Sequence, residues 1–532
     1  MIVTPETATA EVAAAPSASA LAVSSWPKRL DRGFLWIWAG AIVAFAATLR
    51  FHDLGAKSLW LDEIIGSEAT RLQSLGALVA WVKADIDQMP AFPAMTWMLR
   101  GFGDSELALR LPAAVAGVLT IAAVIWFAKQ AFGARVAFVS SLVMAVNPFA
   151  EWYSQEARSY ALLMLLTTLQ MAFAYRVGRD RKLFDWGALT LVSILNLYTH
   201  YMALAATAAA YAYLALSLMA GRRDRKALVQ VATRGLASLA LILLAYSPWL
   251  HALSAFLRSG SKGFARYGPD GQVTLSQALA LLDRLGFSAL LVVFMALGLI
   301  AAVARAIRTP PKADGNRLLI AWLCLPLLAL AARLRGSTLY LDPRYLSFLV
   351  PAMALLCAVG AVEVGHLVEM GAGRLRAFRT TSLAAPAAVI IGGLLAVQTV
   401  PALADALTRP KDDYRGMAAY VTALSPPNSI VIGLGQHSAF IATGLGHYLR
   451  ETGSAVMVAD AAAPGGSRLS QLTGDQGEAW GAVFEPSRVE IANAKGLGFD
   501  VDLRFTHMLL VRPDQSLSRA AQIVALLAWD SS

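Results

Sequence analysis

The stretch "NPFAEWYSQEARSYALLMLLTTL", Asn147–Leu169, places charged side chains directly before an uncharged, mostly apolar run. Glu151, Glu156 and Arg158 all precede this run, and no charged residue occurs within it. A helix that is apolar on every side is stable in lipid or in a very large core. Charged residues at the mouth of such a helix are costly unless they meet a partner, water or a cavity. The stretch therefore predicts a membrane helix with a site at its entrance.

Apolar blocks of this kind recur along the chain of 532 residues, which is 57% hydrophobic and only 15% charged. Most blocks are about 20 residues long, the length that a helix needs to cross a bilayer. We therefore expect a mainly α, polytopic membrane protein with about eleven transmembrane helices. The expected helices lie near residues 34–50, 107–131, 134–149, 158–175, 186–200, 201–219, 232–250, 284–306, 318–333, 344–365 and 384–402.

Three simpler features limit the other function classes. Residues 1–25 are rich in Ala, Thr, Ser and Pro and lack the basic and apolar regions of a signal peptide, so we expect a disordered tail. Cys324 and Cys357 lie inside apolar runs, where a thiol behaves as a small hydrophobe and no disulfide is expected. The net charge of +10 is explained by cytoplasmic loops and does not indicate nucleic-acid binding.

The basic segments predict how the chain is oriented. With the N-terminus in the cytoplasm, the cytoplasmic segments include "PKRLDR", "RVGRDRKL", "GRRDRK", "RAIRTPPKADGNR" and "GRLRAFR", in agreement with the positive-inside rule. The longer connections 51–106, 251–283 and 334–343 then lie outside. An odd number of helices also places residues 403–532 outside. Their β-like runs "SIVIGL" and "HMLLVR" predict a small soluble α/β domain.

Asp62 and Glu63, in "LWLDEI" of the first outer loop, stand between apolar residues. Neighbouring residues on a helix or strand point in different directions, so the two acids are not expected to do the same work. They could form part of a site in a cavity. They could equally mark the start of a helix, where the backbone dipole favours acidic residues.

Four more ionisable residues occur at outer helix mouths. Ser154 could cap a helix that begins at Gln155 and place Glu156 in its first turn. Arg158 does not face Glu156 on a helix, and either extends to the interface or binds an anion such as phosphate. His200, in "LYTHYMAL", is either an interface residue or a site residue, and Arg344 begins the helix in "DPRYLSFLVP".

All these residues are expected on one side of the membrane. A carboxylate that takes a proton from a hydroxyl and cations that hold a phosphate leaving group would suit chemistry on a lipid phosphate. Lys262, Arg266 and Tyr267, in the outer loop "RSGSKGFARYGPDGQ", could add to the cationic part or lie in solvent near lipid head groups.

Several strings carry a resemblance to a known family. They are "LWLDEI", "GDSELALRLPAAVAGVL", "NPFAEWYSQEARSYALLMLL", "LYTHYMAL", "DPRYLSFLVP" and "KDDYRGMAAYV", in this order. With them the chain resembles the polyprenyl-phosphate-dependent glycosyltransferases of the GT-C superfamily. The similar group is the bacterial family 39-like one, related to protein O-mannosyltransferases and to the lipid A sugar and aminoarabinose transferases.

The resemblance implies a GT-C transmembrane catalytic domain over 26–402, whose first periplasmic loop, 51–106, carries amphipathic helices along the membrane. It implies a multi-pass protein of the bacterial inner membrane that transfers a sugar, with inversion, from a polyprenyl-phosphate donor to an unknown envelope acceptor. The acceptor would be a lipid, a polysaccharide or a protein. Besides the donor and this acceptor, membrane lipids are the expected partners.

The resemblance also assigns roles to individual residues. Asp62 would be the catalytic carboxylate and Glu63 would support it. The pocket would be lined by Glu156, Arg158, His200 and Arg344, and the two arginines would hold the donor phosphate.

The chain departs from the family where a His-Pro-Pro-Leu-Tyr string often occurs. Here the sequence reads "DIDQMPAFPAMTW", which keeps Pro90 and lacks the histidine. Asp87 or Gln88 could take over the role of that histidine. No cofactor is required by the sequence, although two acids and a histidine could bind a divalent metal ion, for which no ligands are assigned.

Two alternatives belong to other classes. A transporter or flippase of a lipid-linked sugar would also use a cationic cavity among helices, but no duplicated half is evident in the sequence. Alternatively, the C-terminal domain would be a binding module on an inert bundle. Its Gln436, His437 and His447 fit no metal-binding spacing.

Overall fold

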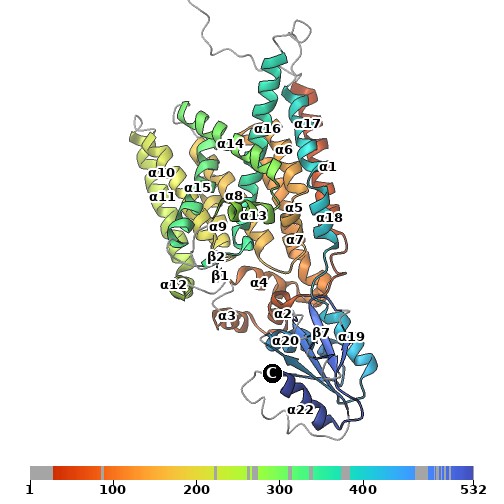
Figure 1. Cartoon of the computed structure of the whole chain (residues 1–532). Helices are drawn as coiled ribbons and strands as arrows, with labels where there is room; N and C mark the ends of the chain where they lie inside the picture. Colours follow the sequence, from red (N-terminus) through yellow and green to blue (C-terminus); the bar gives the residue numbers. More distant parts are fainter. Residues whose placement is uncertain are drawn as a thin grey trace, which may run out of the picture.

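The computed structural model describes residues 28–84, 89–220, 225–259, 264–266, 274–308, 314–334, 339–372, 384–435, 437–461, 477–484, 486, 491–492, 494–495, 499–502 and 505–530. A helix bundle forms the larger part, and a five-stranded sheet lies beyond one end of it, with the helices of the first loop between the two (Figure 1). The expected tail, residues 1–25, lies outside the described residues.

Each of the eleven expected segments contains a helix in the described parts of the chain. These helices are α1 (Lys28–Phe51), α5 (Glu106–Ala131), α6 (Ala134–Ala145), α8 (Tyr160–Asp180), α9 (Leu183–Leu197), α10 (Ala203–Ala220), α11 (Arg225–Tyr246), α14 (Ala289–Arg308), α15 (Gly315–Leu334), α16 (Val350–Ala372) and α17 (Ala384–Val397). By length and composition, six stretches could cross a membrane, and the other five expected segments contain shorter apolar helices. The fold class is therefore confirmed as mainly α and polytopic.

The sequence expectation was wrong at the start of the opening stretch. The expected helix 134–149 ends early as α6, because Pro148 begins a separate short helix, α7 (Pro148–Ser154). Asn147 caps α7 by accepting from the backbone N–H of Ala150 at 2.8 Å. No helix begins at Gln155. The residues between α7 and α8 form an irregular junction instead, and this junction carries Glu156 and Arg158.

The first loop folds into short helices beneath the bundle. They are α2 (Leu61–Ser67), α3 (Leu75–Ala84) and α4 (Ala91–Met98), with 3₁₀ turns at Glu68–Arg71 and Arg100–Phe102. The other outer connections include α12 (Leu250–Ser259), α13 (Leu275–Arg284) and two short paired strands, β1 (Phe264–Arg266) and β2 (Leu339–Leu341). A 3₁₀ turn, Pro343–Leu349, then leads from β2 into α16.

The C-terminal part is an α/β domain, as the sequence predicts. Before it, α18 (Val400–Thr408) packs against α7 of the bundle. The domain contains α19 (Tyr414–Leu424), β3 (Ile430–Leu434), α20 (Ser438–Glu451), β4 (Met457–Asp460), β5 (Ala479–Phe484), β6 (Asp500–Asp502), β7 (Met508–Arg512) and α22 (Arg519–Asp530). The strand order is β4-β3-β5-β7-β6, with the first three parallel. β3 and β7 are the two β-like runs that the sequence analysis named. Every residue of β3 is buried, as expected for a strand covered on both faces.

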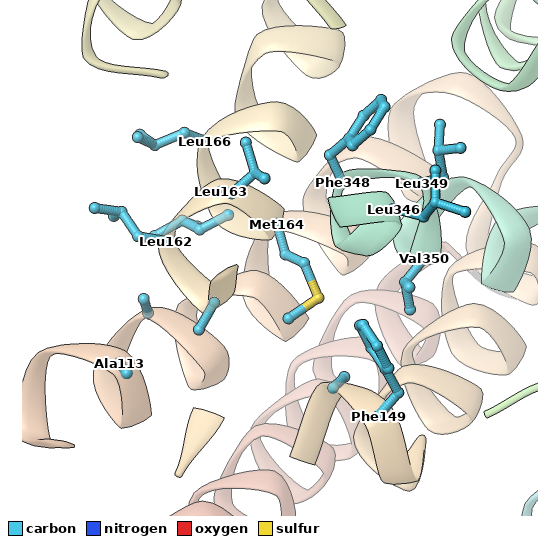
Figure 2. Packing of buried hydrophobic residues seen from close by; sticks show 14 of the residues in the cluster. Ala113, Phe149, Leu162, Leu163, Met164, Leu166, Leu346, Phe348, Leu349 and Val350 are labelled. Carbon is cyan, nitrogen blue, oxygen red and sulfur yellow. The ribbon is translucent and has the colours of Figure 1, made fainter. Parts of the chain in front are cut away.

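Part of the buried core of the bundle lies between α7, α8 and the 3₁₀ turn before α16. Phe348 and Leu349 of the 3₁₀ turn and Val350 are fully or almost fully buried. Figure 2 shows Met164 of α8 extending toward Phe149 of α7, with these three residues on the facing side of the cluster. This packing fixes the end of α16 from which Arg344 enters the site.

Two glycines allow α14 and α16 to cross closely. A Cβ atom at Gly298 would overlap the carbonyl oxygen of Leu356, and one at Gly360 would overlap that of Phe294. Small residues at helix crossings let backbones approach closely in membranes. The pair therefore fixes α16 against α14.

We predict that Gly360→Ala lowers the thermal unfolding temperature of the detergent-solubilised protein, because the added methyl group forces the two backbones apart. Overpacking of this kind costs about 1–3 kcal/mol. Gly393→Ala in α17 is the matched control, since a Cβ there has no neighbour within 4 Å. Equal melting temperatures for the Gly360→Ala variant and the wild type would contradict the close crossing.

Candidate active site

A cavity of about 250 Å³ lies between the first loop, the junction before α8, the α9–α10 turn and the segment that leads into α16. Four sequence-distant segments contribute its polar groups. The lining residues are Asp62, Gly66, Ser67, Met89, Phe92, Pro93, Thr96, Leu109, Ala157, Arg158, Ser159, Tyr160, Thr199, His200, Tyr201, Arg344 and Tyr345. Four of the residues singled out from the sequence are thus brought together: Asp62, Arg158, His200 and Arg344.

Asp62 stands between the two arginines. Its Oδ2 lies 3.1 Å from Nη1 of Arg344 and 3.7 Å from Nη2 of Arg158. About a quarter of the Asp62 side chain and about a fifth of each arginine side chain remain exposed. The cavity therefore presents one carboxylate and two guanidinium groups at its surface.

Local structure explains how each of these three side chains reaches the cavity. Asp62 lies in the first turn of α2, where the helix dipole favours an acid. Arg158 lies in the junction that exists because α7 ends at Ser154. Arg344 is the second residue of the 3₁₀ turn Pro343–Leu349, whose N-cap, Asp342, accepts from the Arg344 backbone N–H at 3.0 Å.

An aromatic wall faces the cavity beside these charges. The ring centroids of Tyr160 and His200 lie 5.7 Å apart, and those of His200 and Tyr345 lie 5.5 Å apart. His200 Nδ1 accepts from the backbone N–H of Met202 at 3.1 Å, which leaves Nε2 as the donor of the neutral ring. The cavity thus combines charged groups with flat apolar surfaces, as ligand sites usually do.

Glu63 lies behind the cavity wall and not in the cavity itself. It is fully buried, does not line the cavity, and accepts from Arg110 Nε at 2.8 Å and Arg110 Nη2 at 2.7 Å. It also accepts from the backbone N–H of Ala157 at 2.7 Å. These donors keep the Glu63 carboxylate charged, and its pKa falls to about 2 although burial alone would raise it. Glu63 is therefore placed to support the site from behind.

Glu156 also turns away from the cavity, contrary to expectation. It is buried, and its Oε1 lies 3.8 Å from the ammonium group of Lys411. The same ammonium group also contacts Glu63. Burial raises the pKa of Glu156 to about 7; Lys411 opposes the shift, while Glu63 and Asp62 add to it. The junction is irregular, so residues two positions apart need not share a side: Glu156 lies at Lys411, whereas Arg158 lies at Asp62.

Sequence reasoning missed two buried cations. Arg110 and Lys411 are both almost completely buried and both contact Glu63. The signal was present, because both lie in strings that carried the family resemblance, "ALRLP" and "KDDYRG". Their partner could not be read from the sequence, since Lys411 is 348 residues from Glu63.

The loop residues considered earlier stay predictions. Lys262, Tyr267, Asp87 and Gln88 lie outside the described residues, and for Arg266 only the backbone is described. That backbone pairs with Leu339 in the β1–β2 ladder, shortly before Arg344 in the chain. Within the described residues, no group of three or more His, Cys, Asp or Glu side chains could hold a metal ion.

The comparisons with known proteins agree with this architecture. The family model of dolichyl-phosphate-mannose-protein mannosyltransferases matches residues 87–251. The structure is similar to that of apo ArnT from Cupriavidus metallidurans, with a TM-score of 0.56 and 16% identity over 92% of this chain and 99% of that one. ArnT from the same organism bound to undecaprenyl phosphate matches with a TM-score of 0.53 and 16% identity, over 90% and 99% of the two chains.

A third similar structure is the archaeal oligosaccharyltransferase AglB from Archaeoglobus fulgidus, in complex with an inhibitory peptide and a dolichol-phosphate. Its TM-score is 0.55 at 12% identity, over 92% of this chain and 75% of that one. Among curated proteins, the sequence has no match. The chain has the GT-C fold, and the matching family model confirms its resemblance to the polyprenyl-phosphate-dependent glycosyltransferases of that superfamily.

We predict a pH dependence of stability that originates at Glu156. Its folded-state pKa, about 7, lies above the ordinary value of 4.5. The stability linked to its protonated form is therefore complete below about pH 4.5 and is lost as the pH rises through about 7. The difference amounts to at most about 3 kcal/mol. Melting temperatures measured from pH 5 to 8.5 should fall more steeply for the wild type than for Glu156→Gln, and parallel curves would contradict the assignment.

Proposed function

We propose that the protein is a glycosyltransferase of the bacterial inner membrane, active on the periplasmic face. It would transfer a sugar from a polyprenyl-phosphate donor to a hydroxyl group of an envelope acceptor: a lipid, a polysaccharide or a protein. The observation that carries this proposal is the cavity in which Asp62 stands between Arg158 and Arg344. Similar folds with undecaprenyl phosphate or dolichol-phosphate bound support the lipid-phosphate part.

The charges of the cavity fit such a donor. A polyprenyl-phosphate sugar is a phosphodiester with a single negative charge. Two guanidinium groups line the cavity beside the carboxylate of Asp62, and Arg344 also pairs with Asp342 at 3.5 Å, so both cations lie where they can attract the donor phosphate. Guanidinium groups also match the geometry of phosphate oxygens.

The same groups fit the reaction. Asp62 takes the proton of the acceptor hydroxyl, whose oxygen attacks the anomeric carbon while the bond from that carbon to the phosphate oxygen breaks. The products are the glycosylated acceptor, polyprenyl phosphate and protonated Asp62. The phosphate gains a second negative charge as Asp62 loses its own, so both arginines become available to the leaving group. A single displacement of this kind inverts the anomeric configuration.

The aromatic wall would hold the sugar. Tyr160, His200 and Tyr345 offer flat surfaces for the apolar face of a ring, and His200 offers one N–H donor. These groups would orient the anomeric carbon toward Asp62, which is the main contribution that a binding pocket makes to a two-substrate reaction.

The proposed orientation is supported by the basic segments. The ends of α14 and α16 that lead into the basic stretches 305–317 and 373–379 lie opposite the C-terminal sheet (Figure 1). The positive-inside rule places those stretches in the cytoplasm, and the cavity then opens on the periplasmic side.

We predict that Asp62→Asn reduces donor turnover at least about 100-fold, because general-base catalysis contributes about that much or more. The assay uses protein in lipid nanodiscs, a panel of polyprenyl-phosphate sugars, an envelope extract as acceptor, and detection of released polyprenyl phosphate. The melting temperature should stay close to that of the wild type, since Asp62 is part-exposed. Turnover by the Asn variant at the wild-type rate would contradict the role of Asp62. Absence of turnover by the wild type on every donor would favour transport of a lipid-linked sugar.

We predict that Arg158→Ala and Arg344→Ala weaken donor use, because each removes a charged donor of hydrogen bonds worth about 1.5–3 kcal/mol. This corresponds to a loss of about 10- to 100-fold in kcat/KM for the donor. Arg100→Ala is the control, since Arg100 is exposed in the first loop, stacks on Trp97 and does not line the cavity. Unchanged donor kinetics in both cavity variants would remove the arginines from the proposed phosphate site.

A further inference from the structure

Lys411 is buried three residues after the end of α18, in the segment that joins the bundle to the C-terminal domain. Its ammonium group donates to Oε2 of Glu63 at 3.2 Å and to the backbone oxygen of Gln155 at 3.3 Å. Oε1 of Glu156 lies 3.8 Å from the same nitrogen. A lysine is rarely buried to this extent unless it has charged partners, and here it has two.

The partners of Lys411 belong to the two segments that carry the cavity charges. Glu63 directly follows Asp62 in α2. Gln155 and Glu156 immediately precede the Ala157–Arg158 pair in the junction, and the Ala157 N–H donates to the other oxygen of Glu63. Lys411 therefore bridges α2 and the junction a short distance behind Asp62 and Arg158.

The C-terminal domain holds the same region from a second side. Tyr448 of α20 accepts from the backbone N–H of Leu59 at 2.7 Å and donates to Glu106 at 3.0 Å. Arg415 of α19 lies 2.9 Å from the same Glu106 carboxylate. The segment that leads into α2 is therefore held by α20, while Lys411 holds α2 itself.

The charge balance of the buried interior depends on Lys411. Two carboxylates, Glu63 and Glu156, share this interior with Arg110 and Lys411. Removal of Lys411 takes one of these two cations away from the carboxylates of Glu63 and Glu156, and it also breaks the contact between α2 and the Gln155 backbone. The first effect acts on stability, and the second acts on the relative placement of Asp62 and Arg158.

We propose that Lys411 is a positioning residue for sugar transfer: it fixes the distance between the carboxylate of Asp62 and the guanidinium group of Arg158. The inference rests on the proposed function of the cavity. It makes the segment after the last membrane helix a part of the active site, and the C-terminal domain is then more than a separable binding module.

The test compares Lys411→Met and Lys411→Arg with a nearby control. Arg409→Gln is suitable, because Arg409 is exposed two residues earlier and pairs with Asp405. Each protein is assayed in nanodiscs well below its melting temperature, for kcat, for the KM of the donor and for binding of undecaprenyl phosphate alone. Lys411→Met should lower kcat at least about tenfold and weaken binding of the lipid phosphate. Lys411→Arg should recover most of both values, and Arg409→Gln should resemble the wild type.

A double variant separates position from charge. Lys411→Met/Glu156→Gln restores the buried charge balance, so its melting temperature should rise above that of Lys411→Met. Its kcat should stay low, because the bridge between Glu63 and Gln155 is still missing. Recovery of kcat together with stability would overturn the proposal, as would wild-type kinetics and wild-type binding in Lys411→Met.

The proposed function itself is tested by the wild-type protein in the same experiment. Turnover by the wild type combined with unaffected Lys411 variants would overturn only the positioning role. If the wild type neither turned over a donor nor bound undecaprenyl phosphate, the proposed function would fail and the inference with it.

Discussion

The buried ion pair between Glu63 and Arg110 is the interaction on which the rest of the site depends. All five N–H groups of Arg110 are used: two on the Glu63 carboxylate and three on the carbonyl oxygens of Leu54, Lys57 and Ser58. The pair thereby fixes the approach to α2 against α5. Charges in a dry interior are retained only when their hydrogen bonds are satisfied in this way, and removing one partner of such a pair costs about 3–5 kcal/mol.

The buried charges around Glu63 and the charges that line the cavity lie in different environments. They are separated only by the backbone of α2 and of the junction before α8. Glu63 and Glu156 lie in the buried interior, where Lys411 is close to both and Arg110 and the Ala157 N–H bind Glu63. Asp62 and Arg158, each one or two residues away, lie on the side that a substrate can reach. In the proposed function, the buried charges would fix the geometry while the part-exposed charges take part in the reaction, as preorganised electrostatic catalysis requires.

The C-terminal domain helps to hold the first loop in place. A transmembrane bundle by itself would leave one side of the first loop without contacts, and that side is covered here by α19, α20 and the segment around Lys411. The short helices of the loop bury apolar side chains such as Ile64, Leu78 and Phe92. Polar contacts with a region more than 300 residues away in sequence add to this packing.

The sequence by itself determined the membrane helices and the sheet strands β3 and β7, and it singled out Asp62, Arg158, His200 and Arg344, which the structure brings together around one cavity. These features follow from local composition and from the high cost of charge at a helix mouth. Only the tertiary structure decided that Glu63 and Glu156 turn inward and that Arg110 and Lys411 lie against them. Which of two adjacent acids meets water depends on what packs against each one, and those partners come from segments that the linear order does not connect.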